Sequence, residues 1–169
     1  MLTLHHAPRR AGLRGLFSAD EYALRRAWGS NLPRSPQVRR PALAAALGLG
    51  DVWVQDETRR FDLPAFKSLG VEFAVARLRA RGSLDGVTTL VCASAGNHGR
   101  AVARAARVAS LDARIYLDRD VASARLDAIA SEGAAIVRVD GTYDDAVRLA
   151  ADDAARTAAW SSPTRRGTA

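Results

Sequence analysis

From residue 51 onward, the hydrophobic positions alternate between a strand-like and a helix-like spacing. Apolar and polar residues alternate from Asp51 to Asp56, and the apolar run from Gly86 to Ala93 is typical of a buried strand. Shorter strand patterns follow from Arg114 to Leu117 and from Ala135 to Val139. Between and after these strands the apolar residues recur at helical spacing, which predicts helices over residues 64–81, 100–109, 122–131 and 143–157.

Strands that alternate with helices in this way predict an α/β fold with a three-layer parallel sheet and right-handed crossovers. The first fifty residues differ, because Pro8, Pro33, Pro36 and Pro41 interrupt any long periodic segment. We expect a helix or two joined by irregular chain there. The last nine residues, 161–169, lose all periodicity and are expected to form an irregular tail.

Composition restricts the class of protein further. The 169 residues, 48% hydrophobic and 25% charged, are enough for one globular domain or slightly more. The chain contains no run of about eighteen apolar residues, so we expect no transmembrane helix and no membrane partner. Its single cysteine, Cys92, excludes an intramolecular disulfide, and a cytoplasmic location is therefore the default expectation.

The net charge of +7 is concentrated near the start of the chain. Residues 1–50 hold 8 arginines against Asp20 and Glu21, whereas residues 51–160 hold 15 basic and 16 acidic residues. Because the middle of the chain is neutral and has no basic stripe interleaved with aromatic residues, we expect no nucleic-acid partner. A transit peptide is an alternative explanation for the arginine-rich start, although that segment lacks a clear amphipathic period.

The basic residues are also unusual in kind, because 24 of the 25 are arginine and the only lysine is Lys67. Pro64 suits a first helical position, which places Lys67 in the first turn of the helix predicted over 64–81. Arginine matches lysine as a surface cation but cannot supply an unprotonated amine, which Schiff-base chemistry requires. The alternative is that one lysine survived by chance on a surface helix.

A second candidate site is the loop Ser94-Ala-Gly-Asn-His-Gly99, which connects a buried strand to a helix. Ligands of open parallel sheets collect beyond the carboxyl ends of the strands. The small residues let backbone N–H groups approach an anion, and the amide of Asn97 can donate or accept a hydrogen bond. Alternatively, the glycines serve only the tight connection, and His98 is only a helix-start residue. His5, His6, His98 and Cys92 show no ligand spacing, so no metal site is expected.

Together the two segments, Asp62-Leu-Pro-Ala-Phe-Lys-Ser-Leu-Gly70 and Ser94–Gly99, resemble the lysine motif and the asparagine loop of the tryptophan-synthase-like (fold type II) pyridoxal-phosphate enzymes. The order of segments is most similar to that of the diaminopropionate ammonia-lyases. The resemblance spans about residues 30–155. Its supporting segments are residues 52–57, 60–61, 113–117, 132–134 and 143–150.

The resemblance implies pyridoxal 5′-phosphate as cofactor and a small amino acid as substrate. It implies that Lys67 bonds covalently to the cofactor and then moves the substrate Cα proton, while Asn97 contacts the 3′ oxygen of the cofactor. The implied reaction is a β-elimination that yields a keto acid and ammonia. The substrate carboxylate would be held by the start of the second helix, through Ser94, Gly96, His98 and Gly99.

Two departures from the family pattern stand out. Diaminopropionate ammonia-lyases carry an Asp just before the Gly-Asn-His of this loop, whereas this chain has Ala95, and in that respect it resembles the serine/threonine dehydratases. After residue 100 the only glycines are Gly133, Gly141 and Gly167, so no glycine-rich loop can cradle the cofactor phosphate. The chain is thus expected to be an N-terminal fragment, inactive alone.

The resemblance also suggests a domain organisation. Residues 1–82 would belong to the large domain and carry the lysine helix, and residues 83–160 would form the small α/β domain with the asparagine loop. Apolar surface around Phe66 and Phe73 would then lack partners, which predicts self-association as a homodimer or pairing with a complementing chain. An alternative from another class is a non-catalytic α/β binding or assembly module.

Overall fold

The computed structural model describes residues 19–30, 32–157 and 159–161, which fall into two compact units, Met1–Pro33 and Arg34–Ala169. Helix α1 (Ala19–Ser30) is the element described in the first unit. Its last residue donates a hydrogen bond from the Ser30 hydroxyl to the carbonyl of Ala27 at 2.8 Å. His5, His6 and residues 162–169 of the expected tail lie outside the described residues.

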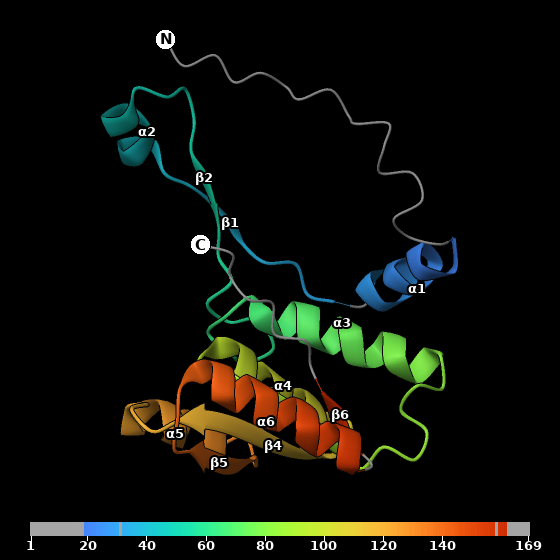
Figure 1. Cartoon of the computed structure of the whole chain (residues 1–169). Helices are drawn as coiled ribbons and strands as arrows, with labels where there is room; N and C mark the ends of the chain where they lie inside the picture. The colour runs from blue at the N-terminus through green and yellow to red at the C-terminus, as the bar shows by residue number, and fades with distance from the viewer. Residues whose placement is uncertain (1–18, 31, 158, 162–169) are drawn as a thin grey trace. The chain divides into compact units, whose positions relative to one another are not determined.

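The second unit is built on a four-stranded parallel sheet with the order β5-β4-β3-β6. Its strands are β3 (Thr89–Ala93), β4 (Asp112–Asp118), β5 (Ala135–Val139) and β6 (Ala159–Ser161). β3 lies inside the sheet, and all five of its residues are buried. The predicted α/β fold with a parallel sheet is therefore confirmed (Figure 1).

Helices cover both faces of this sheet and give it three layers (Figure 1). Helix α6 packs on one face, α4 and α5 pack on the other, and α3 packs on α4. The bounds are α3 (Lys67–Ala80), α4 (Asn97–Val108), α5 (Ser123–Ala130) and α6 (Tyr143–Arg156). None of the described helices is long and apolar enough to span a membrane.

The alternation of side chains along β3 divides the core into two parts. Leu90 and Cys92 belong to the cluster that includes the buried alanines of α4, whereas Val91 and Ala93 belong to the cluster with Ala146 of α6. Successive residues of a strand point to opposite faces, so a continuous apolar run is needed where both faces are covered. This explains why residues 90–93 of β3 are apolar without interruption.

The segment before α3 forms a separate two-stranded sheet. β1 (Gln37–Arg39) pairs antiparallel with β2 (Trp53–Gln55), with Val38 opposite Val54, and α2 (Pro41–Leu47) connects them. The strand predicted over 51–56 is confirmed, but it does not join the parallel sheet. The expectation of a helix or two joined by irregular chain in the first fifty residues is confirmed by α1 and α2, but the strand β1 was not expected.

Three boundaries differ from the sequence-based prediction. The helix predicted from Pro64 begins at Lys67, because Pro64 lies in a turn, and the helix predicted from Arg100 begins at Asn97. β6 was not predicted, and its last residue, Ser161, was expected to begin the tail. A three-residue strand is too short to show a period of its own. Its formation depends on pairing with β3, where Trp160 lies opposite Leu90.

Candidate functional site

Lys67 is the first residue of α3 and follows an unusual turn. Phe61 and Asp62 both have left-handed backbone conformations, with φ of 51° and 61°. Such angles are uncommon outside glycine and are most costly for a bulky residue such as Phe61. The turn is closed by an antiparallel bridge between Arg60 and Leu63, and it delivers the chain to the start of α3.

A buried ion pair holds the beginning of this turn. Arg60, only 8% exposed, donates from Nε to Oε2 of Glu57 at 2.7 Å. The same carboxylate accepts hydrogen bonds from Ser35 at 2.6 Å and from Gln55 at 2.7 Å. These bonds, the one from Arg60 first, lower the pKa of Glu57 from 4.5 to about 2. The carboxylate is therefore charged at neutral pH and ties the turn before Lys67 to residues far away in the sequence.

The loop Ser94–Gly99 leaves the carboxyl end of β3 and enters α4 through a close backbone approach. The N–H of Gly96 donates to the hydroxyl of Ser94 at 3.3 Å. Gly99 is buried, and a Cβ added to it would lie 2.0 Å from the carbonyl oxygen of Ser94. No side chain fits into that space, so Gly99 is required by the geometry of the loop.

The start of α4 is suited to bind an anion. The first N–H groups of a helix have no partner within the helix and carry the positive end of its dipole. In α4 the capping residue is Gly96, which makes no side-chain capping bond, and the first turn contains no acidic residue. Asn97, His98 and Gly99 form that turn, so their backbone N–H groups face whatever lies beyond the end of β3.

Two arginines hold α4 in place through one carboxylate. Glu132, 7% exposed, accepts from Nε of Arg100 and from a terminal nitrogen of Arg107, each at 3.0 Å. Arg100 directly follows the loop, and Glu132 lies in the turn between α5 and β5. These two ion pairs join the first and last turns of α4 to the turn between α5 and β5.

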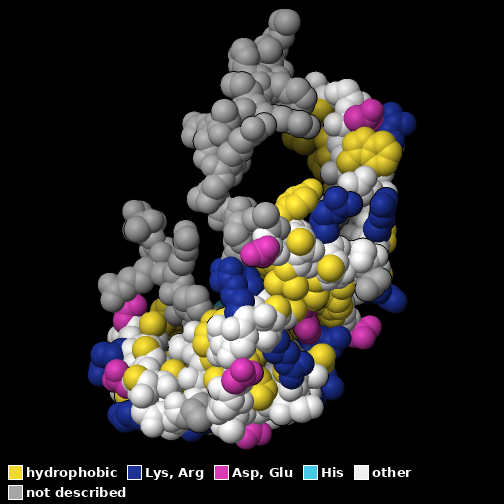
Figure 2. Space-filling model, turned by 90° about the vertical axis from the view of Figure 1, so that its right-hand side faces the viewer, with side chains coloured by type: hydrophobic (Ala, Val, Ile, Leu, Met, Phe, Trp, Pro, Cys, Tyr) yellow, Lys and Arg dark blue, Asp and Glu magenta, His cyan; other side chains and the backbone are white. Residues whose placement is uncertain are grey.

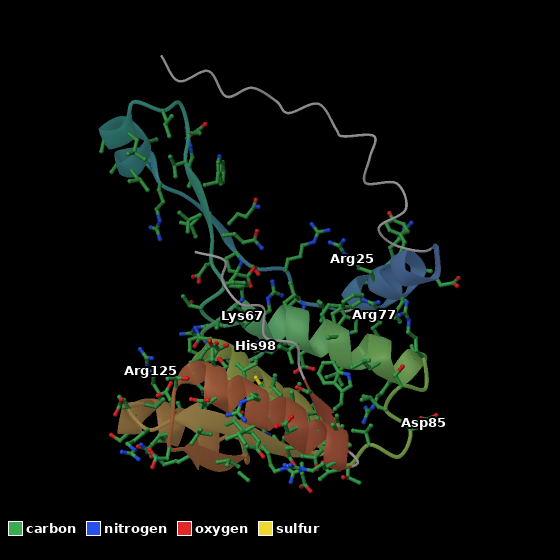
Figure 3. All side chains as sticks on the ribbon, in the orientation of Figure 1. Arg25, Lys67, Arg77, Asp85, His98 and Arg125 are labelled. Atoms are coloured by element: carbon green, nitrogen blue, oxygen red, sulfur yellow. The ribbon has the colours of Figure 1, made fainter. Side chains whose placement is uncertain are left out.

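The tertiary structure brings Lys67 and the loop together. Both Lys67 and His98 line one cavity of ≈ 530 Å³, and they come from the first turns of α3 and α4 (Figure 3). Burial lowers the pKa of His98 below its usual value of 6.5, and the positive charge of Lys67 lowers it further. The ammonium group itself lies 5.1 Å from the centre of the Phe66 ring. The imidazole is thus neutral at pH 7 and can hydrogen-bond without adding charge to the site.

The order of the strands adds to this arrangement. The chain moves outward from β3 to β4 and β5 and then returns to place β6 on the other side of β3. Ligands of open parallel sheets bind where the order reverses in this way, beyond the carboxyl ends of the two strands. The loop Ser94–Gly99 leaves β3 at that end.

Not every predicted site residue reaches the cavity. Ser94 is half-buried, Gly96 and Asn97 are exposed and Gly99 is buried, and none of these four lines the cavity. Most of the other lining residues were not singled out from the sequence, among them Arg77 on α3 and Trp160 on β6. The steps of three and four residues from Lys67 through Gly70 and Ala74 could have suggested Arg77, but nothing local could have placed Trp160.

Gly133 and Gly141, the glycines that follow residue 100 in the described part of the chain, have local structural roles. Gly133, with φ of +89°, lies in the turn after α5. A Cβ on Gly141 would meet Asp145, whose carboxylate and Thr142 form the capping box of α6. Neither glycine belongs to a phosphate-binding loop in the described part of the chain. Within residues 19–30, 32–157 and 159–161 there is also no cluster of three His, Cys, Asp or Glu side chains able to hold a metal ion.

Comparisons with known proteins identify relatives of this chain. Residues 31–165 match the model of a family described as pyridoxal-phosphate dependent enzyme. The diaminopropionate ammonia-lyase of Escherichia coli strain K12 is 36% identical over 122 residues, which are 63% of this chain and 31% of that protein. The corresponding protein of Salmonella typhimurium is 36% identical over 137 residues, 70% of this chain and 34% of the relative.

A solved structure shows the same likeness in three dimensions. The apo form of Escherichia coli diaminopropionate ammonia lyase matches with a TM-score of 0.78 and 31% identity, over 91% of this chain and 47% of that one. A biosynthetic L-threonine dehydratase of Haemophilus influenzae is 29% identical over 96 residues, 57% of this chain and 18% of that protein. The chain thus spans about a third of the curated ammonia-lyases and less than half of the solved structure.

Proposed function

Because the chain belongs to the family of pyridoxal-phosphate dependent enzymes, we propose that it forms the lysine-bearing part of an ammonia-lyase. The proposed substrate is a small amino acid with a leaving group on Cβ, and the products are a keto acid and ammonia. The observation that carries the proposal is that Lys67 and His98, from two separated motifs, line the same cavity. Lys67 is the only amine of any side chain in the sequence.

The residues present fit part of the proposed cofactor. The amine of Lys67 is exposed at the cavity and would bond to the aldehyde carbon. Asn97, exposed in the first turn of α4, would contact the ring oxygen next to that carbon. The phosphate has no glycine-rich cradle among the described residues, so its site would have to come from elsewhere. When bound, pyridoxal phosphate would withdraw electrons from the substrate Cα.

The remaining steps follow from this chain's own residues. The backbone N–H groups of Gly96 to Gly99 and the hydroxyl of Ser94 would hold the substrate carboxylate at the positive end of α4. The substrate amine would displace Lys67 from the aldehyde carbon, and the freed Nζ would then take the proton from Cα. That proton would leave with the group that departs from Cβ. The resulting enamine takes up water and releases the keto acid and ammonia, which balances the atoms of the reaction. The imidazole of His98 would line the substrate side of the cavity. Because it is neutral, it would not attract a further anion beside the substrate carboxylate.

Ala95 favours a second candidate within the same chemistry. Ala95 lies between Ser94 and Gly96 in the sequence, and its methyl group can neither donate nor accept a proton. The amine of Lys67 is then left to transfer the Cα proton without a second acid or base, as in a dehydratase that acts on serine or threonine. The likeness to a threonine dehydratase over 96 residues supports this candidate.

The experiment is covalent trapping of the cofactor. The full chain is mixed with pyridoxal phosphate, reduced with borohydride, digested and mapped by mass spectrometry. Lys67 and the α-amine of Met1 are the only amines that can react. If the site is formed, Lys67 is labelled faster than the α-amine and faster than in chain unfolded in guanidinium, and Lys67→Arg removes that label. Labelling of Lys67 at the same rate in folded and unfolded chain would overturn the proposal.

A protection measurement tests the substrate. A small amino acid added before the reduction should lower the labelling of Lys67. Ser94→Ala should weaken this protection, whereas Ser131→Ala should not, because Ser131 lies on α5's C-terminal turn and bonds to Ala128. Stronger protection by 2,3-diaminopropionate than by serine would favour the ammonia-lyase, and the reverse would favour the dehydratase.

A further inference from the structure

Helices α3 and α4 lie side by side, and polar contacts join them at two levels (Figure 1). Near the end of α3, Arg79 donates a hydrogen bond to the carbonyl of Ala109, the residue that follows α4. About midway along both helices, Nε of Arg104 on α4 lies 4.0 Å from Oε1 of Glu72 on α3. The two helices therefore run in the same direction, and the second contact is the one nearer to the candidate site.

The contact between Glu72 and Arg104 is a mostly buried ion pair without a hydrogen bond. Figure 2 shows Lys, Arg, Asp and Glu side chains spread over the surface, where water solvates them. By contrast, the side chains of Glu72 and Arg104 are only 18% and 16% exposed. Nε of Arg104 is buried and has no acceptor among the residues that the structure describes. Such donors are rare, because they lose their bonds to water and gain none in return.

The separation of 4.0 Å means that this pair is not at its most favourable distance. An approach of about 1 Å would complete a hydrogen bond from Nε of Arg104 to the carboxylate. Burial raises the pKa of Glu72, whereas the positive charge of Arg104 lowers it. The two charges depend on each other, since neither has another ion-pair partner in the described part of the chain. Their attraction therefore draws α3 towards α4, against the packing of the side chains between the helices.

The pair is placed so that it controls the start of both helices. Glu72 follows Lys67 by five residues and Arg104 follows His98 by six, which are distances of about 7.5 and 9 Å along the helix axes. Because a hydrogen-bonded helix bends little over two turns, a change of spacing at the pair also moves the first turns. We propose that Glu72 and Arg104 are positioning residues, whose ion pair sets how closely Lys67 approaches His98. This inference rests on the proposed function for the importance of that spacing, and on the ion pair for its cause.

The titration of His98, followed by NMR, reports this spacing without any cofactor. Burial lowers the pKa of His98 most, and the positive charge of Lys67 lowers it further. The chain has three histidines, and the signal that disappears in His98→Gln identifies the one that lines the cavity. Glu72→Gln should raise the pKa of His98 towards 6.5, because α3 would move away with Lys67 and expose the imidazole. Loss of the carboxylate charge alone would lower that pKa, so the direction of the shift identifies its cause.

Two controls separate the ion pair from other effects. Asp85→Asn removes one carboxylate beyond the end of α3 and should leave the pKa of His98 unchanged (Figure 3). Arg104→Gln should raise the pKa of His98, and Glu72→Gln added to it should raise that pKa no further, since the partner is already missing.

Three results would overturn the proposal. These are an unchanged or lowered pKa of His98 in Glu72→Gln, an equal rise when Arg104 is already replaced, and an equal rise in Asp85→Asn. Urea unfolding checks that each variant folds. Where Glu72→Gln does not fold, Glu72→Met takes its place, because methionine is uncharged and suits a mostly buried helical position.

Trapping of pyridoxal phosphate on the same variants separates this inference from the proposed function. Glu72→Gln should slow the labelling of Lys67 about threefold, which corresponds to about 0.65 kcal/mol and is typical of a partly exposed ion pair. If Lys67 of the original chain is labelled no faster than in unfolded chain, the proposed function fails, while the shift of His98 still supports the pair. If that labelling is fast and His98 does not shift, positioning by the pair fails, while the proposed function stands.

Discussion

Replacing Gly99 with alanine should be the most damaging single-methyl change in the loop. The added Cβ would lie 2.0 Å from the carbonyl oxygen of Ser94, 3.1 Å from its carbon and 3.3 Å from Cγ2 of Ile115. The first two neighbours are backbone atoms of the tight turn, and the third is a fully buried core side chain. None of them can rotate out of the way.

The magnitude follows from the displacement required. To restore ordinary contact, the start of α4 must move away from Ser94 by about 1.4 Å, in an interior packed as densely as a crystal. Over-packing of a core costs roughly 1–3 kcal/mol, and a clash with rigid backbone belongs at the upper end. We expect Gly99→Ala to lower the free energy of unfolding by about 3 kcal/mol. With a urea m-value of about 2 kcal/mol/M, the midpoint falls by about 1.5 M.

The assay is urea unfolding followed by circular dichroism, and Gly96→Ala is the matched control. A Cβ on Gly96 would meet only the hydroxyl of Ser94, at 4.0 Å, and its backbone angles are open to alanine. Loss of a glycine cap costs only a few tenths of a kcal/mol to about 1 kcal/mol. Midpoints of Gly99→Ala and Gly96→Ala within about 0.3 M of each other would refute the close approach of α4 to Ser94.

Three further predictions concern stability and reactivity. Gly70→Ala should raise the free energy of unfolding by about 0.5–1 kcal/mol, since its Cβ meets nothing within 4 Å and glycine weakens a helix interior; an unchanged or lower urea midpoint would contradict this. Stability should be lost as pH falls from 4.5 towards 2, because the pKa of Glu57 is lowered by Arg60 in the folded state. In thermal melts recorded over this pH range, Glu57→Gln should make the melting temperature depend less on pH. Cys92 should react with Ellman's reagent only on unfolding, since burial raises the pKa of its thiol to about 12. Prompt labelling of the folded chain at pH 8 would contradict the burial of Cys92 in β3.

The sequence determined the fold class and indicated which residues to test as the candidate site. The apolar residues 90–93 and the alternating helices already indicated a sheet covered on both faces, because only such a sheet buries every residue of a strand. Lys67 and the loop Ser94–Gly99 could be singled out from composition and local pattern. The roles of these residues remain predictions until the trapping experiment is done.

The tertiary structure decided what these motifs do together. Lys67 and His98 are 31 positions apart, and only the packing of α3 on α4 brings them to one cavity. β6 forms because β3 offers it a partner, and it contributes Trp160 to the cavity that Lys67 and His98 line. Short strands and long-range packing carry no local period, since their free energy comes from contacts between distant segments. Local pattern thus determined the elements, while pairing and burial decided how the candidate site is assembled.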